Sequence, residues 1–229
     1  MDGANLAEMC NLYGNPLIRG FTTNPTLMRK AGISDYRAFA IEVLQSIPDR
    51  PISFEVFSDE FAEMEQQALT IARWGANVFA KIPVTNTRGE SSIPLIRRLS
   101  NQKVKLNVTA LMTLAQVEEV AEAMHSCPAG YISVFAGRIA DTGRDPVPIM
   151  RDCVGILKKF SNLELIWASP RELLNVFQAD AVGCHVITAT NDILCKLHLV
   201  GKDLNEYSLD TVKMFRDDAV KAGFSITRQ

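Results

Sequence analysis

Seven short runs rich in β-branched residues recur along the chain, and a segment with helical periodicity separates each run from the next. This alternation is typical of βαβ units around a parallel sheet. The runs cover residues 18–24, 52–57, 78–84, 105–111, 131–137, 164–169 and 185–191. No linker interrupts the pattern, so residues 1–229 are predicted to form a single α/β domain.

The number of runs indicates which α/β fold to expect. Eight strand and helix units close into a (β/α)8 TIM barrel, and seven runs preceded by an N-terminal stub approach that number. The stub, residues 1–6, has room only for a very short first strand. Residues 208–223 carry apolar side chains on overlapping helical faces and end at a glycine, which predicts an extra C-terminal helix.

Several helix starts can be placed from capping signals. Thr113 and Gln116 have the spacing of a capping box, and a further helix is expected after Ser58. Asp145 and Ser169 each precede a proline, the arrangement of a capping residue followed by the first residue of a helix.

The composition narrows the class of protein. Hydrophobic residues make up 47% of the chain and charged residues 22%, as expected for a protein with a sizeable core. The net charge of −2 provides no basic field for nucleic acid or for an anionic membrane surface. The sequence shows neither an apolar stretch of membrane-spanning length nor a signal peptide pattern, so a cytoplasmic location is expected. Chemistry on small molecules is the favoured class of function.

The cysteines and histidines give no sign of a disulfide framework or a metal site. The 5 cysteines are odd in number and lack C-x-x-C spacing, so we expect reduced thiols. The 3 histidines are scattered, with no pair on one helix face. No metal and no cofactor are predicted.

One lysine interrupts an apolar run. Lys81 lies within residues 78–84, which otherwise have the composition of a fully buried strand. A buried ammonium is costly unless it is paired or loses its proton, and a neutral lysine amine is the nucleophile of Schiff-base chemistry. The alternative is an edge strand from which Lys81 reaches water.

Polar side chains at the ends of the other runs favour the reactive interpretation, because barrel active sites form at the carboxyl ends of strands. These side chains are Thr23, Asn24, Glu55, Asn107, Thr109, Ser133, Arg138, Ser169 and Arg171. Each has an ordinary alternative, such as a turn for Thr23 and Asn24 or a helix cap for Ser169. Their recurrence on successive strands indicates a shared site.

Two arginines follow late runs, where barrels often bind phosphate. Arg171 stands after Ser169 at an expected helix N-terminus, and Arg138 follows the preceding run. Guanidinium groups bind phosphate oxygens with paired hydrogen bonds. A small phosphorylated carbonyl compound is therefore the predicted substrate.

Four motifs resemble those of the transaldolases, especially the short members of the transaldolase and fructose-6-phosphate aldolase family. They are Gly20-Phe21-Thr22-Thr23-Asn24-Pro25-Thr26, Ala80-Lys81-Ile82-Pro83-Val84-Thr85, Leu106-Asn107-Val108-Thr109-Ala110-Leu111 and Ser133-Val134-Phe135-Ala136-Gly137-Arg138-Ile139. The resemblance runs nearly end to end. It implies a (β/α)8 barrel that transfers a dihydroxyacetone unit between sugar phosphates through a Schiff base, without a cofactor, in the pentose phosphate pathway.

The resemblance also implies roles for individual residues. Lys81 would be the nucleophile and Asp2 the acid/base for carbon–carbon cleavage, while Glu55 with Thr109 would handle a catalytic water. The implied substrate-binding residues, which hold donor hydroxyls or the acceptor phosphate, are Thr23, Asn24, Asn107, Ser133, Phe135, Arg138, Ser169 and Arg171.

Two positions bear on which family reaction to expect. Aldolases of the family have glutamine at the position of Glu55 and tyrosine at that of Phe135. Transaldolases have glutamate and phenylalanine there, which this chain resembles. A carboxylate can pass protons through a water, which an amide cannot do. Transfer is therefore favoured. The alternatives are a fructose-6-phosphate-type aldolase that releases dihydroxyacetone, and a catalytically silent sugar-phosphate binding barrel.

The C-terminal helix bears on assembly. It carries more apolar surface than a solvated helix usually exposes, so a homo-oligomer is expected. Short family members resemble this chain in ending with such a helix and assemble as pentamers or decamers, which makes a ring the first expectation and a dimer the second. The alternative is a helix that folds back over its own barrel.

Overall fold

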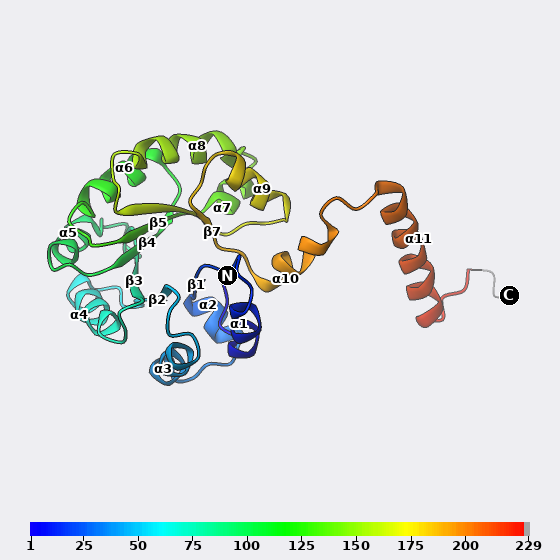
Figure 1. The fold of residues 1–229 in the computed structure, drawn as a ribbon, viewed down its shortest axis with the longest axis horizontal. Helices are drawn as coiled ribbons and strands as arrows, with labels where there is room; N and C mark the ends of the chain where they lie inside the picture. The colour runs from blue at the N-terminus through cyan, green and yellow to red at the C-terminus, as the bar shows by residue number, and fades with distance from the viewer. Residues whose placement is uncertain (227–229) are drawn as a thin grey trace. The chain divides into compact units, whose positions relative to one another are not determined.

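The computed structural model describes residues 1–226, which divide into two compact units with a boundary between Leu194 and Cys195. The first unit contains a curled sheet of seven parallel strands in sequence order, with helices on its outer side (Figure 1). The strands are β1 (Phe21–Thr22), β2 (Ile52–Glu55), β3 (Val78–Pro83), β4 (Leu106–Leu111), β5 (Gly130–Val134), β6 (Leu163–Trp167) and β7 (Val186–Ile187). This architecture confirms the predicted α/β barrel fold.

Most helices of the first unit connect successive strands, while the first precedes β1 and the last follows β7. They are α1 (Leu6–Tyr13), α2 (Pro25–Lys30), α3 (Tyr36–Ser46), α4 (Phe61–Ala72), α5 (Ile93–Asn101), α6 (Leu114–Ala123), α7 (Ala136–Asp141), α8 (Pro146–Leu157), α9 (Leu174–Ala181) and α10 (Asn191–Leu194). Their apolar residues join those of the sheet in one buried core, which includes Met64, Val117 and Met150. Since β3 is covered on both faces, its sequence is a nearly continuous apolar run.

The N-terminal segment takes the place of a first strand. Asp2 forms an isolated parallel bridge with Thr22, and the N–H of Thr22 donates to the carbonyl oxygen of Met1 at 2.9 Å. On its other side, the N–H of Asp2 donates to the carbonyl oxygen of Ala189 at 2.8 Å. The segment therefore lies between β1 and the residues after β7, where it forms an isolated bridge and no strand of its own.

The predicted element positions are confirmed with one exception. All seven strands form within the predicted runs or one residue outside them, although β1 and β7 keep only two residues each. Thr113 and Gln116 form the capping box of α6, and the Asp145 side chain caps α8. A helix follows Ser58, as expected, and starts at Phe61.

The prediction that Ser169 caps a helix at Pro170 is wrong. Ser169 has a φ of 59°, in the left-handed region, and α9 begins only at Leu174. The side chain of Asn175 accepts hydrogen bonds from the N–H groups of Arg171 at 2.7 Å and Glu172 at 3.2 Å. These two N–H groups are therefore occupied by the protein and do not form the open helix N-terminus that was expected for a phosphate.

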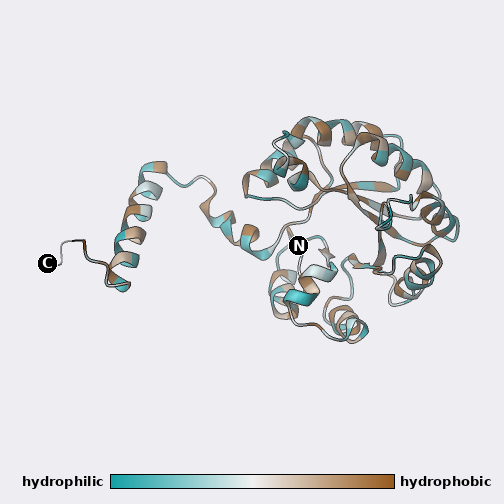
Figure 2. Cartoon of the chain, turned by 180° about the vertical axis from the view of Figure 1, so that it is seen from behind, coloured by the Kyte–Doolittle hydropathy of each residue, from teal (hydrophilic) through white to brown (hydrophobic). Residues whose placement is uncertain are grey.

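The second unit consists of a short 3-10 helix, Cys195–Leu199, and the helix α11 (Leu204–Lys221). The predicted C-terminal helix is thus confirmed, but it starts earlier than residue 208 because the Asp203 side chain caps the N–H groups of Asn205 and Glu206. Figure 2 shows hydrophobic residues distributed along α11. The exposed ones include Leu204, Leu209, Val212, Phe215 and Val220.

Within residues 1–226, no helix combines the length and the apolar character that a membrane crossing requires. The prediction that the whole chain is one domain stays a prediction.

Candidate active site

Lys81 is a buried lysine in a central strand. Strand β3 pairs with β2 on one side and β4 on the other, and Lys81 is only 6% exposed. Its Nζ lies 2.9 Å from Glu55 Oε2 and donates to the carbonyl oxygen of Thr23 at 3.1 Å. The alternative of an edge strand with Lys81 in water is therefore wrong, and the buried ammonium is compensated by a carboxylate.

Glu55 reaches Lys81 from the end of the neighbouring strand. The two residues are register partners in β2 and β3, so their side chains project from the same level of the sheet. The Glu55 side chain is 17% exposed. Its backbone carbonyl oxygen accepts a hydrogen bond from the hydroxyl of Tyr36 at 2.8 Å, which ties the end of β2 to α3. A carboxylate at this distance can exchange a proton with the Lys81 amine.

Asp2 belongs to the same polar region. Its Oδ1 accepts a hydrogen bond from the hydroxyl of Thr22 at 2.8 Å, and the hydroxyl of Thr188 lies 2.6 Å from that of Thr22. Burial raises the pKa of Asp2, while the nearby Lys81 ammonium and the Thr22 hydrogen bond act in the opposite direction. A carboxyl group whose pKa is raised above its ordinary value accepts and gives up protons closer to physiological pH, as an acid/base group must.

Buried polar residues from three strands form a second network. The amide nitrogen of Asn107 donates to the hydroxyl of Ser53 at 2.9 Å, and the hydroxyl of Ser133 donates to the amide oxygen of Asn107 at 2.7 Å. Asn107 is the register partner of Lys81. The network fixes the orientation of the Asn107 amide beside the lysine, which suits it to bind substrate hydroxyls.

Thr109 has a buried hydroxyl without a hydrogen-bond partner among the described residues. It is the register partner of Pro83, two residues beyond Lys81, and it precedes Ala110, whose φ is 67° at an irregularity of the β4–β5 pairing. An unpaired buried hydroxyl costs free energy unless a water or ligand binds it. Thr109 is therefore a candidate for binding a small polar molecule.

Thr23 and Asn24 have defined structural roles in the segment that joins β1 to α2. The Thr23 hydroxyl donates to the carbonyl oxygen of Ser53 at 3.1 Å, and its own carbonyl oxygen accepts from Lys81. Asn24 caps α2 by accepting from the N–H of Leu27 at 2.9 Å. Asn24 thus acts as a helix cap with an extended backbone, and Thr23 contacts the central lysine.

The two predicted phosphate-binding arginines come together near Gly137. A Cβ added to Gly137 would lie 1.6 Å from the carbonyl oxygen of Ser169 and 3.3 Å from Nε of Arg171, so only glycine permits this approach. Arg138 follows directly in the chain, and its guanidinium lies 6.0 Å from the ring of Phe135. The segments that follow β5 and β6 therefore make close contact at Gly137, with Arg138 next to it in the chain and Arg171 Nε beside it.

Arg171 is engaged by a carboxylate that the sequence did not single out. Its Nε donates to Asp141 Oδ1 at 2.9 Å, and its Nη2 contacts Asp141 Oδ2. The Arg171 guanidinium lowers the pKa of Asp141, and Arg138 adds to this effect. The pair leaves one edge of the Arg171 guanidinium for a ligand.

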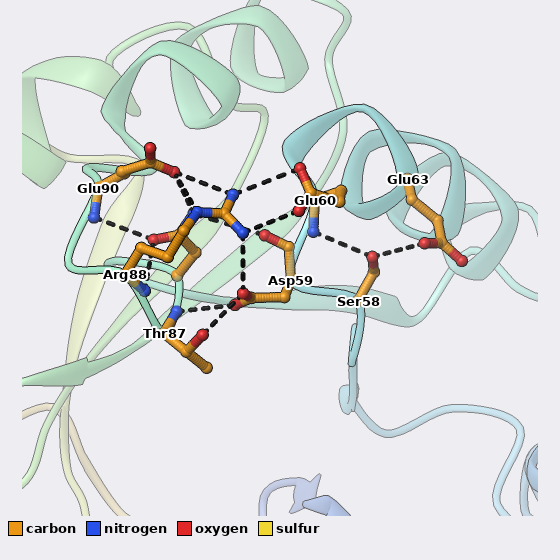
Figure 3. A network of polar contacts seen from close by, with 8 residues as sticks. Ser58, Asp59, Glu60, Glu63, Thr87, Arg88 and Glu90 are labelled. Atoms are coloured by element: carbon orange, nitrogen blue, oxygen red, sulfur yellow. Dashed lines mark hydrogen bonds and ion pairs between the residues drawn. The ribbon is translucent and has the colours of Figure 1, made fainter.

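Charged residues also join the loops that follow β2 and β3 (Figure 3). Arg88 contacts Glu60 at 2.8 Å and Asp59 at 3.2 Å, and the hydroxyl of Thr87 donates to Asp59 at 2.7 Å. These loops continue the strands that carry Glu55 and Lys81. The network therefore ties together the ends of the two strands that form the central ion pair.

A groove of about 730 Å³ lies apart from this site. It is lined by residues of α5, α6 and α8, including Arg97 and Glu119, and contains none of the predicted site residues. Among residues 1–226, no group of three or more His, Cys, Asp and Glu side chains is placed to hold a metal ion.

Sequence reasoning missed Thr22, Ser53, Thr188 and Asp141. Thr22 belongs to the first quoted motif, but no role was assigned to it. Ser53, Thr188 and Asp141 are single polar residues whose partners are distant in the sequence. No local pattern marks them.

Comparison with known proteins identifies relatives along the whole chain. The family model described as Transaldolase/Fructose-6-phosphate aldolase matches residues 1–226. A protein of Thermoanaerobacter sp. named probable transaldolase is 33% identical over 227 residues, which are 99% of this chain and 98% of the relative. A probable transaldolase of Dehalococcoides mccartyi is 33% identical over 198 residues, 86% of this chain and 88% of the relative. The chain therefore belongs to the transaldolase and fructose-6-phosphate aldolase family.

Proposed function

We propose that this chain is a class I transaldolase, which transfers a dihydroxyacetone unit between sugar phosphates through a Schiff base on Lys81. One observation carries the proposal: the buried Lys81 Nζ lies 2.9 Å from the Glu55 carboxylate, and its charge acts on Asp2. The chemistry needs an amine, a carboxylate that can take its proton, and a second acid/base group. Membership of the family supports the same reaction class.

Schiff-base formation would use the Lys81–Glu55 contact. Transfer of a proton from the ammonium to Glu55 leaves a neutral amine, whose lone pair attacks the ketone carbon of the donor sugar. The carbinolamine then loses its hydroxyl as water, with the proton returned by Glu55, and an iminium ion remains. The unpaired hydroxyl of Thr109 is suited to bind this water.

Carbon–carbon cleavage would use Asp2. The carboxylate accepts the proton of the hydroxyl next to the scissile bond, the bond electrons move into the iminium, and an aldose phosphate leaves. The enamine that remains on Lys81 adds to a second aldehyde by the reverse steps, and hydrolysis frees the product. Asn24, Asn107 and Ser133 would hold the donor hydroxyls.

The substrate phosphate would bind Arg138 and Arg171. Asp141 occupies the Nε edge of Arg171, so the phosphate would use the opposite edge together with Arg138. Ser169 and Phe135 flank these arginines. Because α9 starts only at Leu174, we assign the anion to side chains and not to a helix N-terminus.

Transfer is preferred to release of free dihydroxyacetone because Glu55 is a carboxylate in contact with the amine and Phe135 has no hydroxyl. The silent-barrel alternative assumed that the chain lacks a competent first strand. Asp2 is held by backbone hydrogen bonds on both sides, which supports the enzyme instead.

Borohydride trapping tests the proposal. Wild-type protein incubated with fructose 6-phosphate and borohydride is expected to gain the mass of the reduced adduct on a peptide that contains Lys81. Product analysis with an added aldose phosphate then separates transfer from release. A wild-type protein that gains no mass at Lys81 would contradict the Schiff-base mechanism.

We also propose that the chain forms a homo-oligomer in the cytoplasm and that α11 contributes to the interface. The exposed apolar residues of α11 support this assembly, with a ring as the first choice and a dimer as the second. Sedimentation of the full chain beside a chain truncated after Lys202 tests it. A monomeric full-length protein, or an oligomer unaffected by the truncation, would refute the role of α11.

A further inference from the structure

Thr188 is a buried threonine next to the segment that closes the sheet. It follows β7, and its N–H donates to the carbonyl oxygen of Trp167 at 3.1 Å. Its hydroxyl lies 2.6 Å from that of Thr22, which in turn lies 2.8 Å from Asp2 Oδ1. Three side chains from three separate segments thus form one chain of hydrogen bonds that ends on the Asp2 carboxyl group.

The hydrogens available to this chain depend on the charge of Asp2. When Asp2 is ionised, Thr22 donates to the carboxylate, so Thr188 must donate to Thr22, and both hydroxyl hydrogens are used. When Asp2 is protonated and donates to Thr22, the Thr22 hydrogen turns to Thr188. In the described part of the chain, Thr188 Oγ1 has a single side-chain partner, Thr22, so its own hydrogen is then left without one.

The ionised arrangement therefore satisfies both hydroxyl hydrogens, whereas a protonated Asp2 that donates to Thr22 leaves the Thr188 hydrogen without a side-chain partner in the described part of the chain. Donation from Thr188 also polarises the Thr22 hydroxyl and strengthens its bond to the carboxylate, as is usual for linked hydrogen bonds. Both effects act on Asp2 from a residue that does not touch it.

We propose that Thr188 is a positioning residue for Asp2: it directs the Thr22 hydroxyl towards the carboxyl group and so favours the ionised, base form. The inference rests on the proposed function, which gives Asp2 the acid/base role. It predicts that removal of the Thr188 hydroxyl makes Asp2 harder to ionise.

Other charged groups also act on Asp2, and they are the same in wild type and in every Thr188 variant. Lys81 acts on it from β3, with Glu55 of β2 bound to the same amine, and the Met1 amino group acts from its own segment. Burial lowers the pKa of the Met1 amino group to about 6. Only the difference between a variant and the wild type therefore reports on Thr188.

The test is the pH dependence of kcat for transfer from fructose 6-phosphate to an aldose phosphate. Thr188→Val keeps the size of the side chain and removes the hydroxyl. Because cleavage needs ionised Asp2, the acidic limb of the profile should move to higher pH by roughly half a unit to one unit, with a smaller change on the alkaline side. Thr188→Ser restores the hydroxyl and should return the limb to the wild-type position.

Thr70→Val is a matched control, because the Thr70 hydroxyl donates to the carbonyl oxygen of Gln66 within α4, away from Asp2. Its profile should follow the wild type. If Thr188→Val does not fold, as judged by its melting temperature, Thr188→Ala is measured in its place. An unmoved acidic limb in the folded variant, or an equal shift in Thr188→Ser, would overturn the proposal.

The same preparations are trapped with borohydride. If wild type is trapped at Lys81 but the acidic limb of Thr188→Val does not move, the role of Thr188 is refuted and the proposed function is not. Absence of trapping in wild type refutes the proposed function.

Discussion

The candidate site contains two cation–carboxylate pairs in different surroundings. The Lys81 and Glu55 side chains are 7% and 17% exposed, whereas those of Arg171 and Asp141 are 44% and 51% exposed. A buried charge that loses its partner is costly, while an exposed pair is screened by water and contributes little to stability. The comparison separates a pair kept from solvent, to which the proposed function assigns proton transfer, from a pair open to solvent, to which it assigns anion binding.

The largest expected effect comes from removing the buried amine. Lys81→Met keeps the apolar stem and deletes only the nucleophile, so kcat for transfer should fall by at least roughly three orders of magnitude. Steady-state kinetics measure the loss, and circular dichroism checks that the variant folds. Substantial transfer by a folded Lys81→Met protein would mean that the buried pair is structural.

The exposed cations should affect binding and not chemistry. Arg171→Ala and Arg138→Ala should each raise KM for phosphorylated substrates by roughly 10- to 100-fold, because each removes a charged hydrogen bond. KM for unphosphorylated analogues should change little. Arg98→Ala is the control, since Arg98 pairs with Glu65 between α5 and α4. Equal effects on both substrate types would show that the arginines only maintain the structure.

A third prediction concerns the carboxylate of the buried pair. Glu55→Gln combined with Phe135→Tyr should shift the balance from transfer towards free dihydroxyacetone by several-fold, because an amide cannot accept the Lys81 proton and a new hydroxyl is placed beside the donor. Quantifying both products from one reaction gives the partition. A partition equal to that of wild type would remove the discriminating role of these positions.

The smallest effect is expected at the carboxylate of the exposed pair. Asp141→Asn should change the melting temperature by less than about 2 °C at neutral pH, because an exposed pair is screened. Arg171 lowers the pKa of Asp141, so what stability the pair gives is present above the ordinary aspartate range and is lost as pH falls. The melting temperatures measured at pH 7 and at pH 3 should therefore differ less for Asp141→Asn than for wild type. A large loss at neutral pH would show that the pair supports the fold.

The two pairs also differ in how visible they are in the sequence. Lys81 stands out because a charged residue interrupts an apolar run, and Glu55 is a charged residue in another run, so the sequence predicts both as site residues. Arg171 was predicted as a phosphate ligand, but its partner Asp141, thirty positions earlier, was not. A local pattern reveals a residue that breaks it, and it does not reveal which distant residue becomes its partner.

The sequence by itself determined the seven strands, the capping box of α6, the C-terminal helix and the position of the lysine in β3. These features depend on periodicity and on contacts between residues a few positions apart, which the order of amino acids contains directly. The exact ends of the strands were less well determined. The lengths of β1 and β7 depend on how many of their residues pair with β2 and β6, which is two in each case.

Only the tertiary structure decided that Ser169 adopts a left-handed backbone, that Asn175 occupies the nearby N–H groups, and that Asp2, Thr22 and Thr188 share hydrogen bonds. Thr22 and Thr188 are 166 positions apart. Hydrogen bonds between such residues form when barrel closure brings the first and last strands together, and no local preference specifies them.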